Sequence, residues 1–500
     1  MLPDQALLTG IRPDRNEWRF YRTAVWPDLF GRALLARQWD PIGIESRLRL
    51  DPHPDKGAAL NAPARLGAAA TAPSRSLRPC STARLGARHP RAAGAPWQGT
   101  RPTSRYSEPA GRRLTSPRIL TRATGGDRYG PMPPSAPLVA TILPPFEGFG
   151  PGQAGAVGTM VRLLSGAPGY RPLVIGGPQA SVPFADVPFH AVRAARWRPG
   201  NVNIRYGAAL LQTLWRAGPA LIEVHNRPEL AIWLARRLPT TPVLLFLHND
   251  PQEMRRAGTS AERARLLCRL ARVVVVSEYL QRRLLEGISQ PARAPVVLPN
   301  AIELSALPPP RAREPLILFA GRVVRDKAPD VFVAACATAL PELADWRAEL
   351  IGADRFHIDS PETAFTNVIR ADAERAGVRA VGYRNHASVL DAMARAAMVV
   401  VPSRWQEPFG LVALEAMASG AALISSSRGG LREVAGDVAL YIDPDDPPAV
   451  AAAICSLAAD PPRRAAMGRA GRARAAAFDV PVIAGRLAAL RREVLAGAGG

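Results

Sequence analysis

From residue 136 onward, short apolar runs alternate with longer amphipathic stretches. The apolar runs read PLVATIL, PLVIGG, LIEVHN, PVLLFLHND and RVVVVSE, and NVNIRYGAALLQTLWRAG at 201–218 is one of the stretches between them. Continuous apolar strands that alternate with helices predict a parallel sheet covered by helices on both faces. We therefore expect an α/β domain over residues 136–308.

A proline-rich break, PPPRAREP at 308–315, interrupts this rhythm before it restarts. The second series of strand-like runs is LILFAGR, WRAELIGA, VRAVGY, AMVVVPS and AALISSS. Two such series with a proline-rich joint favour two doubly wound domains that face a cleft lined by strand ends. The second domain is expected over 309–480, and a helix at 481–500 is expected to cross back to the first domain.

The first part of the chain has a different pattern. Residues 15–52 mix aromatic and β-branched residues with a Pro-Asp turn and a glycine, which predicts a small antiparallel sheet in a β-rich segment, 1–56. From 57 to 135 the chain is dominated by Ala, Arg, Pro, Ser and Gly with little periodicity. This composition predicts a disordered basic linker.

Charge adds a second difference between the two parts. The net charge is +22, and residues 1–131 contribute +12 of it, from 22 Lys plus Arg against 10 Asp plus Glu. Such an excess favours an anionic partner such as nucleic acid, an anionic membrane surface or a nucleotide. An arginine-rich coding bias explains the same excess without any partner, and both interpretations stay open.

Cysteine spacing and hydropathy indicate the cellular compartment of the protein. The four cysteines, Cys80, Cys268, Cys336 and Cys455, form no C-x-x-C pair and no metal-ligand spacing. They indicate free thiols in a reducing compartment. The sequence contains no apolar run of the ~20 residues that a membrane span needs, and no signal peptide pattern. We therefore predict a cytoplasmic protein whose contact with the inner membrane face would be peripheral.

The strongest group of candidate residues lies in PSRWQEPFGLVALEAMASG. Glu407 and Glu415 are eight residues apart across a predicted strand-to-helix junction. Pro408 suits a helix start, and the backbone N–H groups of Phe409, Gly410 and Leu411 would lie at the helix N-terminus, a position that favours anions. A carboxylate inside this helix can accept two hydrogen bonds from a vicinal diol. Each glutamate alone would otherwise be read as a surface acid or an ordinary helix residue.

This segment resembles the E-x7-E signature of the retaining family-4 glycosyltransferases, which have the GT-B fold of two Rossmann-like domains. The resemblance covers about residues 136–495. It implies metal-independent transfer of a hexosyl unit from a nucleoside-diphosphate sugar to a saccharide or lipid-linked saccharide acceptor. The first domain is most similar to bacterial enzymes of lipopolysaccharide core or capsule synthesis. By the same resemblance, Glu407 holds sugar hydroxyls and Glu415 holds the ribose.

The loop LFAGRVVRDKAPD is similar to the family's donor-phosphate loop. By that resemblance Gly321 contacts the donor, and Arg322 and Lys327 hold its diphosphate. Lys327 is one of only two lysines among the 64 cationic residues. The family usually has glycine after the lysine, whereas this chain has Ala328 followed by Pro329. A solvated charge cluster at a strand end is the alternative interpretation.

Further donor contacts follow from the resemblance. The glycine-rich loop ILPPFEGFGPGQAGAVGTMV would place Gly155 and Ala156 beside the donor, and VRAVGYRNHASVL would place backbone atoms of Val381 and Tyr383 near the base. The formal G-x-G-x-x-G in the first loop lies too far from its strand, and no acid ends the next strand, so a dinucleotide-binding motif is rejected. SSSRGGLREVAG resembles the family's Gly-Gly loop and would lie near the donor phosphates or sugar, and a plain Gly-Gly turn is the alternative.

Two histidines end strands in the first domain, His225 and His248. His248 matches the active-site histidine of the resembling family better, and a structural role is the alternative for each. The remaining acceptor-side candidates are Asn249 and Glu278. We expect the catalytic set to be His248, Glu407, Arg322 and Lys327, with no cofactor. We also expect no metal, because the D-x-D of YIDPDDP is better interpreted as an Asp-Pro turn before a helix.

The N-terminal stretch EWRFYRTAVWPDLFGRALLARQWDPIG resembles a WGR domain, a module of some nucleic-acid-associated proteins. The naming tripeptide is replaced here by Trp39-Asp40-Pro41, which favours a truncated or degraded copy. Met132 directly precedes the transferase-like region, so translation from it would leave out the first 131 residues. Our alternative function is accordingly a nucleic-acid-binding protein with an inactive or DNA-directed transferase domain.

Overall fold

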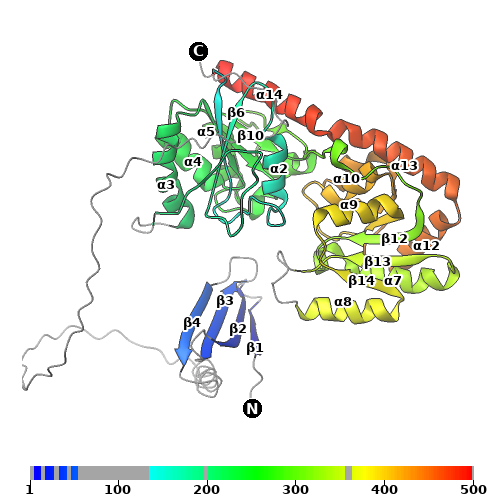
Figure 1. Cartoon of the computed structure of the whole chain (residues 1–500). Helices are drawn as coiled ribbons and strands as arrows, with labels where there is room; N and C mark the ends of the chain where they lie inside the picture. Colours follow the sequence, from blue (N-terminus) through cyan, green and yellow to red (C-terminus); the bar gives the residue numbers. More distant parts are fainter. Residues whose placement is uncertain are drawn as a thin grey trace, which may run out of the picture. The chain divides into compact units, whose positions relative to one another are not determined.

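The computed structural model describes residues 135–195, 201–354 and 363–497, together with the backbone of four N-terminal strands (Figure 1). The chain divides into two compact units, Met1–Arg113 and Leu114–Gly500.

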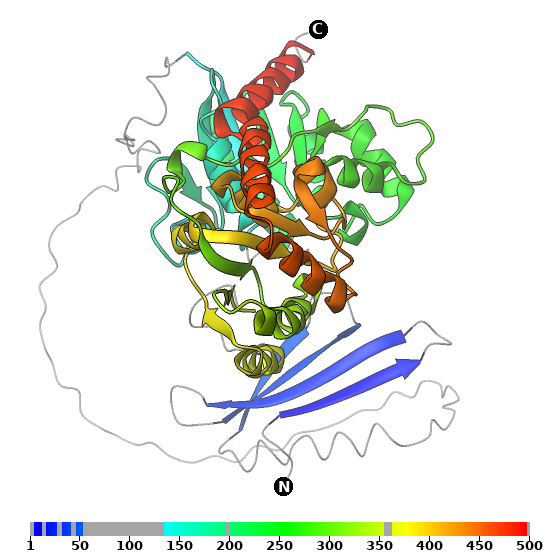
Figure 2. The same ribbon diagram turned by 90° about the vertical axis from the view of Figure 1, so that its right-hand side faces the viewer.

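The first unit contains a four-stranded antiparallel sheet in the order β1-β2-β3-β4 (Figure 2). Its strands are β1 (Gln5–Arg12), β2 (Glu17–Pro27), β3 (Ala33–Pro41) and β4 (Arg47–His53). Strand β1 precedes the pattern at 15–52 and lies inside the predicted β-rich segment, 1–56. The predicted linker at 57–135 lies outside the described residues except for its last position, and the WGR-like identity of the segment stays a prediction.

The second unit begins with a parallel sheet of seven strands, in the order β11-β10-β9-β8-β5-β6-β7. Its strands are β5 (Leu138–Ile142), β6 (Arg171–Gly176), β7 (Phe189–Ala191), β8 (Leu221–His225), β9 (Val243–Leu247), β10 (Arg272–Val275) and β11 (Val296–Val297). The helices are α2 (Ala156–Leu164), α3 (Val202–Ala217), α4 (Pro228–Arg237), α5 (Ser260–Arg269) and α6 (Glu278–Leu285), with the 3-10 helix η2 (Pro251–Glu253). Strands β8 and β9 are buried along their whole length, as continuous apolar runs predict.

A second parallel sheet of six strands follows, in the order β14-β13-β12-β15-β16-β17. Its strands are β12 (Glu314–Ala320), β13 (Arg347–Ile351), β14 (Val378–Gly382), β15 (Ala396–Val401), β16 (Ala422–Ser425) and β17 (Ala439–Tyr441). The helices are α7 (Pro329–Ala339), α8 (Ala364–Arg375), α9 (His386–Arg395), α10 (Leu411–Ser419), α11 (Leu431–Ala435), α12 (Pro447–Ala458) and α13 (Pro461–Ala475). Short 3-10 helices are η3 (Leu304–Ala306), η4 (Arg325–Lys327), η5 (Leu340–Glu342), η6 (Gly436–Val438) and η7 (Ala476–Phe478). The predicted pair of doubly wound domains is confirmed.

The last helix, α14 (Val480–Gly497), packs on the first of these domains, while α13 before it packs on the second (Figures 1 and 2). Arg491 of this helix forms a two-pronged ion pair with Glu223 of β8, at 2.8 and 2.9 Å. The two side chains are only 3 and 2% exposed. Thr141 Oγ1 donates a further hydrogen bond to the same carboxylate. The charge that α14 buries is therefore fully paired.

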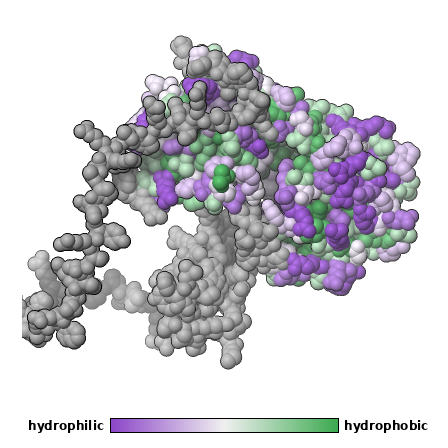
Figure 3. All heavy atoms as spheres, in the orientation of Figure 1, coloured by the Kyte–Doolittle hydropathy of each residue, from purple (hydrophilic) through white to green (hydrophobic). Residues whose placement is uncertain are grey.

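The chain passes between the two domains twice, and the two passages are joined. Ile302 donates to Phe478 O at 2.9 Å and accepts from Val480 N at 3.0 Å. One buried apolar cluster contains residues of both domains, from Ala140 to Phe478. Figure 3 shows hydrophilic residues over much of the visible surface of the second domain. Among the described helices, none combines the length and apolarity that crossing a membrane requires.

Candidate functional site

Lys327 and Glu407, which lie on separate loops, form an ion pair. The Glu407 side chain is buried, at 9% exposure, and Ser403 Oγ donates to Glu407 Oε1 at 2.7 Å. The Lys327 ammonium lies 4.8 Å from the centroid of the Trp405 ring, which is a cation–π contact. The opposite charges of Lys327 and Glu407, both predicted donor-site residues, therefore neutralise each other in this structure.

Backbone hydrogen bonds hold these two loops together. They follow β12 and β15, which are adjacent parallel strands, so their carboxyl ends meet at one edge of the sheet. The carbonyl oxygen of Asp326 accepts from the backbone N–H groups of Arg404 and Trp405 at 2.9 and 3.0 Å. Ser403 Oγ lies 3.1 Å from the same oxygen. Because β12 and β15 are adjacent and their following loops are hydrogen-bonded, Lys327 and Glu407 lie close enough to pair.

The residue after Lys327 has a strained backbone. Ala328 adopts φ 53° and ψ 47°, in the left-handed region, and is fully buried. This conformation costs a residue with a Cβ about 1–2 kcal/mol, and glycine avoids the cost. Pro329 follows as the first residue of α7, where its fixed φ suits the helix. Ala328 stands where the resembling family usually has glycine, and it adopts the left-handed backbone that glycine would adopt more easily.

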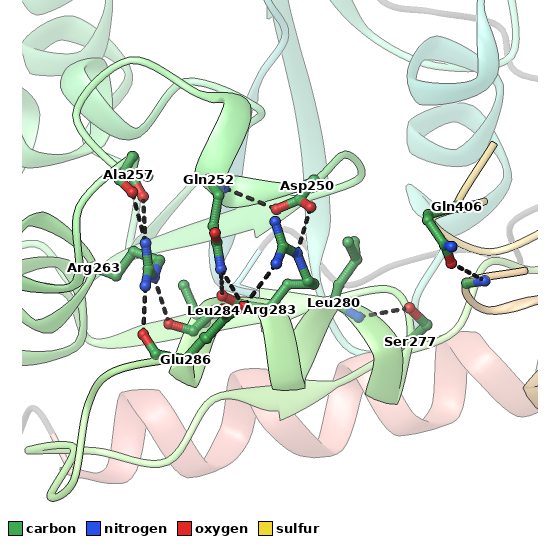
Figure 4. Close-up of polar contacts among 12 residues, drawn as sticks. Asp250, Gln252, Ala257, Arg263, Ser277, Leu280, Arg283, Leu284, Glu286 and Gln406 are labelled. Carbon is green, nitrogen blue, oxygen red and sulfur yellow. Dashed lines mark hydrogen bonds and ion pairs between the residues drawn. The ribbon is translucent and has the colours of Figure 1, made fainter. Parts of the chain in front are cut away.

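The Gly-Gly loop at 425–436 packs directly on the backbone of Glu407. Gly429 donates its N–H to Gln406 Oε1 at 2.7 Å (Figure 4), and Gly430 donates to Glu407 O at 2.7 Å. Gly429 has φ 61°, and a Cβ built on it would lie 2.2 Å from Glu407 O. Only glycine fits there, and the loop supports the backbone that presents the Glu407 carboxylate.

Helix α10 begins later than the sequence suggests. Pro408 was expected to suit the helix start, and this is wrong: the helix begins at Leu411, because Gly410 before it adopts φ 108°. A Cβ on Gly410 would lie 2.6 Å from the side chain of Leu431. Phe409 is buried, and its ring lies edge-on to Phe478, 5.8 Å between centroids. Anion binding by these N–H groups stays a prediction.

Glu415, the predicted ribose ligand, lies inside α10 and contacts a histidine. His386 Nε2 is 2.7 Å from Glu415 Oε1. This hydrogen bond raises the pKa of His386, against the opposing effect of burial. Because the raised pKa reflects an ion pair, His386 is charged below that pKa, and the pair weakens as the pH rises through it. Asn385 caps the helix that starts at His386.

The two predicted histidines contact each other. His225 Nδ1 is 2.9 Å from His248 Nε2, and the rings stack at a centroid distance of 5.2 Å. Asn226 holds this arrangement, because its Oδ1 accepts the backbone N–H of His248 at 2.7 Å. Burial lowers the pKa of His248 to about 4, although a hydrogen bond with Asn300 opposes the shift. Both imidazoles are therefore neutral at physiological pH.

A carboxylate covers the predicted donor contacts of the first domain. Gly155 caps α2 and Ala156 is its first residue. Glu147 Oε1 accepts the backbone N–H of Gly158 at 3.0 Å, and the Gly155 backbone also bonds to it. Burial raises the pKa of Glu147. Of the two residues that the resemblance places beside the donor, Gly155 is thus bonded through its backbone to the chain's own carboxylate in this structure.

The other predicted donor residues lie at the ends of strands in the second domain. Gly321 and exposed Arg322 follow β12. Val381 is in β14 and half-buried Tyr383 follows that strand. Val381 also lines an open cavity of about 710 Å³ between β13, β14 and α9. Four arginines and two acids share its wall: Arg347, Arg379, Arg384, Arg395, Glu349 and Asp391.

The other two predicted acceptor-side residues, Asn249 and Glu278, lie on different segments of the first domain. Asn249 is exposed next to His248. Glu278 is the exposed first residue of α6, and its backbone N–H donates to Glu433 Oε2 of the second domain at 2.6 Å. Ser277 Oγ donates to Pro408 O at 2.6 Å, which brings this end of α6 beside the Glu407 loop.

The D-x-D segment forms the expected turn. Asp446 caps α12, and the N–H of Asp445 donates to Asp443 Oδ1 at 3.1 Å. Arg404 pairs with Asp445 at 3.0 Å and Arg428 pairs with it at 3.3 Å. These carboxylates are therefore engaged by guanidinium groups.

Sequence reasoning did not single out several residues that build the site. They are Glu147, Asn226, Ser403, Trp405, His386 and Glu433. Ser403 and Trp405 lie within four residues of Glu407, so their closeness in the sequence was the available signal, whereas His386 is 29 residues from Glu415. Glu433 contacts α6, which is about 150 residues away in the sequence, and no local pattern identifies such a partner.

Two family models match adjoining parts of the chain. The model described as Glycosyltransferase Family 4 matches residues 156–306, and the model described as Glycosyl transferases group 1 matches residues 304–474. The boundary between the matches falls at the joint between the two parallel sheets.

Curated relatives match parts of the same region. A putative glycosyltransferase, YtcC, of Bacillus subtilis is 25% identical over 46% of this chain and 60% of its own length. The lipopolysaccharide core biosynthesis mannosyltransferase LpsB of Rhizobium meliloti is 28% identical over 51% of this chain and 77% of its own. A D-inositol 3-phosphate glycosyltransferase of Segniliparus rotundus is 36% identical over 37% of this chain and 41% of its own length. The matched region thus covers less than two thirds of the length of YtcC and of the D-inositol 3-phosphate glycosyltransferase.

Solved structures share the architecture. A sucrose-phosphate synthase of Thermosynechococcus elongatus superposes with a TM-score of 0.59 at 23% identity, over 72% of this chain and all of that chain. HepE of Anabaena, solved in complex with UDP and glucose, superposes with a TM-score of 0.57 at 18% identity, over 71% of this chain and all of that chain. The predicted GT-B fold is confirmed.

Proposed function

We propose that this chain, whose residues 156–474 make up a glycosyltransferase of the GT-B fold, moves a hexosyl unit from a nucleoside-diphosphate sugar to a saccharide or lipid-linked saccharide. The observation that carries the proposal is the pairing of Lys327 with Glu407 where β12 and β15 end. It brings a cation for phosphate and a carboxylate for sugar hydroxyls into one place, on a chain with both glycosyltransferase domains.

In this proposal Lys327 and Arg322 hold the donor diphosphate. A compact ammonium acts as a point charge between phosphate oxygens, and a guanidinium supplies a planar fork. Negative charge grows on the leaving phosphate as the bond to the anomeric carbon breaks, and fixed cations stabilise it. Lys327 would exchange its contact with Glu407 for the phosphate, which frees the Glu407 carboxylate for the sugar.

The reaction itself would use the leaving group as its base. The acceptor hydroxyl oxygen forms a bond to the anomeric carbon, the bond from that carbon to the phosphate oxygen breaks, and the hydroxyl proton passes to that phosphate. Attack from the face that the nucleoside diphosphate leaves retains the anomeric configuration, as in the resembling family. His248, neutral beside His225, would contribute polar contacts near the reacting carbon rather than a charge.

Glu415 would hold the ribose. Its carboxylate is half-buried in α10 and already accepts a hydrogen bond from His386. A vicinal diol offers two donors to the same kind of acceptor. Val381 lies in β14 and Tyr383 follows it, three residues before His386, so the base would lie next to the ribose there.

Two comparisons support finer choices. HepE is solved with UDP and with UDP-glucose, which supports a uridine diphosphate sugar as the first donor to test. Relatives named as lipopolysaccharide core mannosyltransferases support a role in bacterial surface-glycan synthesis. The acceptor would then be a growing saccharide on a lipid, met at the inner membrane face.

The proposal is tested by replacing Lys327 and Glu415 singly with Ala and measuring turnover of an accepted sugar nucleotide. Lys327→Ala should lower kcat by about 100-fold or more, because leaving-group stabilisation acts in the transition state. Glu415→Ala should raise the donor KM by about tenfold, because it removes hydrogen bonds to a charged group.

Glu374→Ala is the matched control, since Glu374 is exposed on α8. It should leave both constants unchanged. Unchanged kcat/KM in both site variants would refute the assignment.

A further inference from the structure

Helix α6 connects the two halves of the proposed active site. Its first turn contacts the second domain, and its last turn holds the loop that follows His248 (Figure 4). It is eight residues long, from Glu278 to Leu285.

The contacts at the N-terminus of α6 cross between the domains. Glu433 of α11 accepts the backbone N–H groups of Glu278 and Tyr279, the first at 2.6 Å. Ser277, which is 3% exposed, accepts the N–H of Leu280 at 3.1 Å and donates its own proton to Pro408 O. The free N–H groups at a helix start need acceptors, and here one domain supplies them to a helix of the other.

The contacts at the C-terminus of α6 reach the histidine loop. Arg283 pairs with Asp250, two residues beyond His248, at 2.6 Å. The guanidinium of Arg263, which is 3% exposed, donates to the carbonyl oxygens of Leu284 and Glu286 at 2.9 and 2.5 Å.

The same guanidinium donates to the carbonyl oxygens of Ala257 and Gly258 at 3.3 and 2.9 Å (Figure 4). Each of its nitrogens therefore has a backbone partner, as a buried guanidinium requires. The loop at 248–258 and helix α6 are thereby bound into one body.

We propose that Glu433 is a positioning residue: by capping α6 across the domain boundary, it sets the His248 loop relative to the Glu407 loop. This inference rests on the proposed function, because it assumes that both loops act on one substrate. Pro408 adjoins Glu407 and Asp250 lies close to His248, so a shift of α6 would change the separation of the two loops.

The cap depends on an acceptor oxygen more than on a charge. Burial raises the pKa of Glu433, so the surroundings favour the neutral form relative to water. Arg282 pairs with it at 3.2 Å, but the arginine side chain is 64% exposed and the pair is screened. Glutamine, which keeps one acceptor oxygen at the same place, should therefore replace glutamate with little loss.

The test compares Glu433→Ala and Glu433→Gln in the full chain, with Glu374→Ala on exposed α8 as the matched control. Hydrogen–deuterium exchange of a peptide over 277–285 reports the cap, with a peptide over 260–269 of α5 as internal reference. Turnover of an accepted sugar nucleotide reports the positioning.

Glu433→Ala should speed exchange of the first-turn amides of α6 about 5- to 10-fold, as loss of a helix cap predicts. It should lower kcat about tenfold or more through misplacement, with the donor KM changed less than twofold. Glu433→Gln and Glu374→Ala should behave as wild type in both measurements.

Wild-type kcat in Glu433→Ala overturns the proposal, and so does equal impairment of the Gln and Ala variants. If the wild type turns over no sugar nucleotide, the proposed function fails and the positioning role fails with it. An active wild type with an unaffected Ala variant removes only the positioning role.

Discussion

At the scale of single residues, the proposed donor site depends most on Lys327. Its ammonium lies between the Glu407 carboxylate and the Trp405 ring, directly before the left-handed Ala328. The carboxylate and the ring both contact the ammonium and hold it in place. An arginine head group is planar and wider, and needs a fork-shaped partner.

We therefore predict that Lys327→Arg keeps the charge and still lowers kcat/KM about 10- to 100-fold, because small misplacements at a reacting centre are costly. Arg325→Lys, at an exposed position of the same turn, is the matched control and should stay near wild type. Steady-state kinetics with one donor check both variants. Full activity of Lys327→Arg would show that charge alone suffices there.

The sequence identified Lys327, Glu407 and Glu415 as separate ligands of a donor. It did not foresee that Glu407 would pair with Lys327, or Glu415 with His386, in the structure. Motif resemblance describes where a substrate would bind. The internal pairs arise because buried or half-buried charges need partners in the folded chain itself.

At the scale of elements, the strand pattern predicted the sheets well, because buried parallel strands are continuous apolar runs. The start of α10 was placed too early, since Pro408 resembles a first helical residue while the left-handed Gly410 excludes helix before Leu411. The partners of α14 and α6 depend on pairs far apart in the chain, such as Arg491 with Glu223. Local periodicity carries no information about such pairs.

Helix α14 gives a stability prediction. Arg491→Ala should lower the free energy of unfolding by about 3–5 kcal/mol, because it leaves the buried Glu223 carboxylate unpaired. Thermal and urea unfolding of the variant measure this loss. Replacing both partners, with Arg491→Met and Glu223→Leu, should cost much less than the single change.

Arg486→Ala, on the exposed side of the same helix, serves as control and should change stability by less than about 0.5 kcal/mol. A single variant at Arg491 that unfolds like the control would contradict the importance of the buried pair.

At the scale of the whole molecule, two repeated α/β series were sufficient to predict two doubly wound domains. Their mutual contacts were not predictable, because they join residues such as Ser277 and Pro408 that are 131 positions apart. Under the proposed function those contacts matter, since the proposed donor residues lie mainly in the second domain and the proposed acceptor residues in the first. A GT-B enzyme needs both groups in one place to transfer a sugar.

The central claim is that the chain uses a nucleoside-diphosphate sugar. Its most direct test is to incubate the purified full-length protein with a panel of UDP-, GDP-, ADP- and dTDP-sugars and to measure the nucleoside diphosphate released. The account predicts release from at least one donor by the wild type, and loss of that release in Lys327→Ala. No release from any donor, or equal release by the variant, would contradict it.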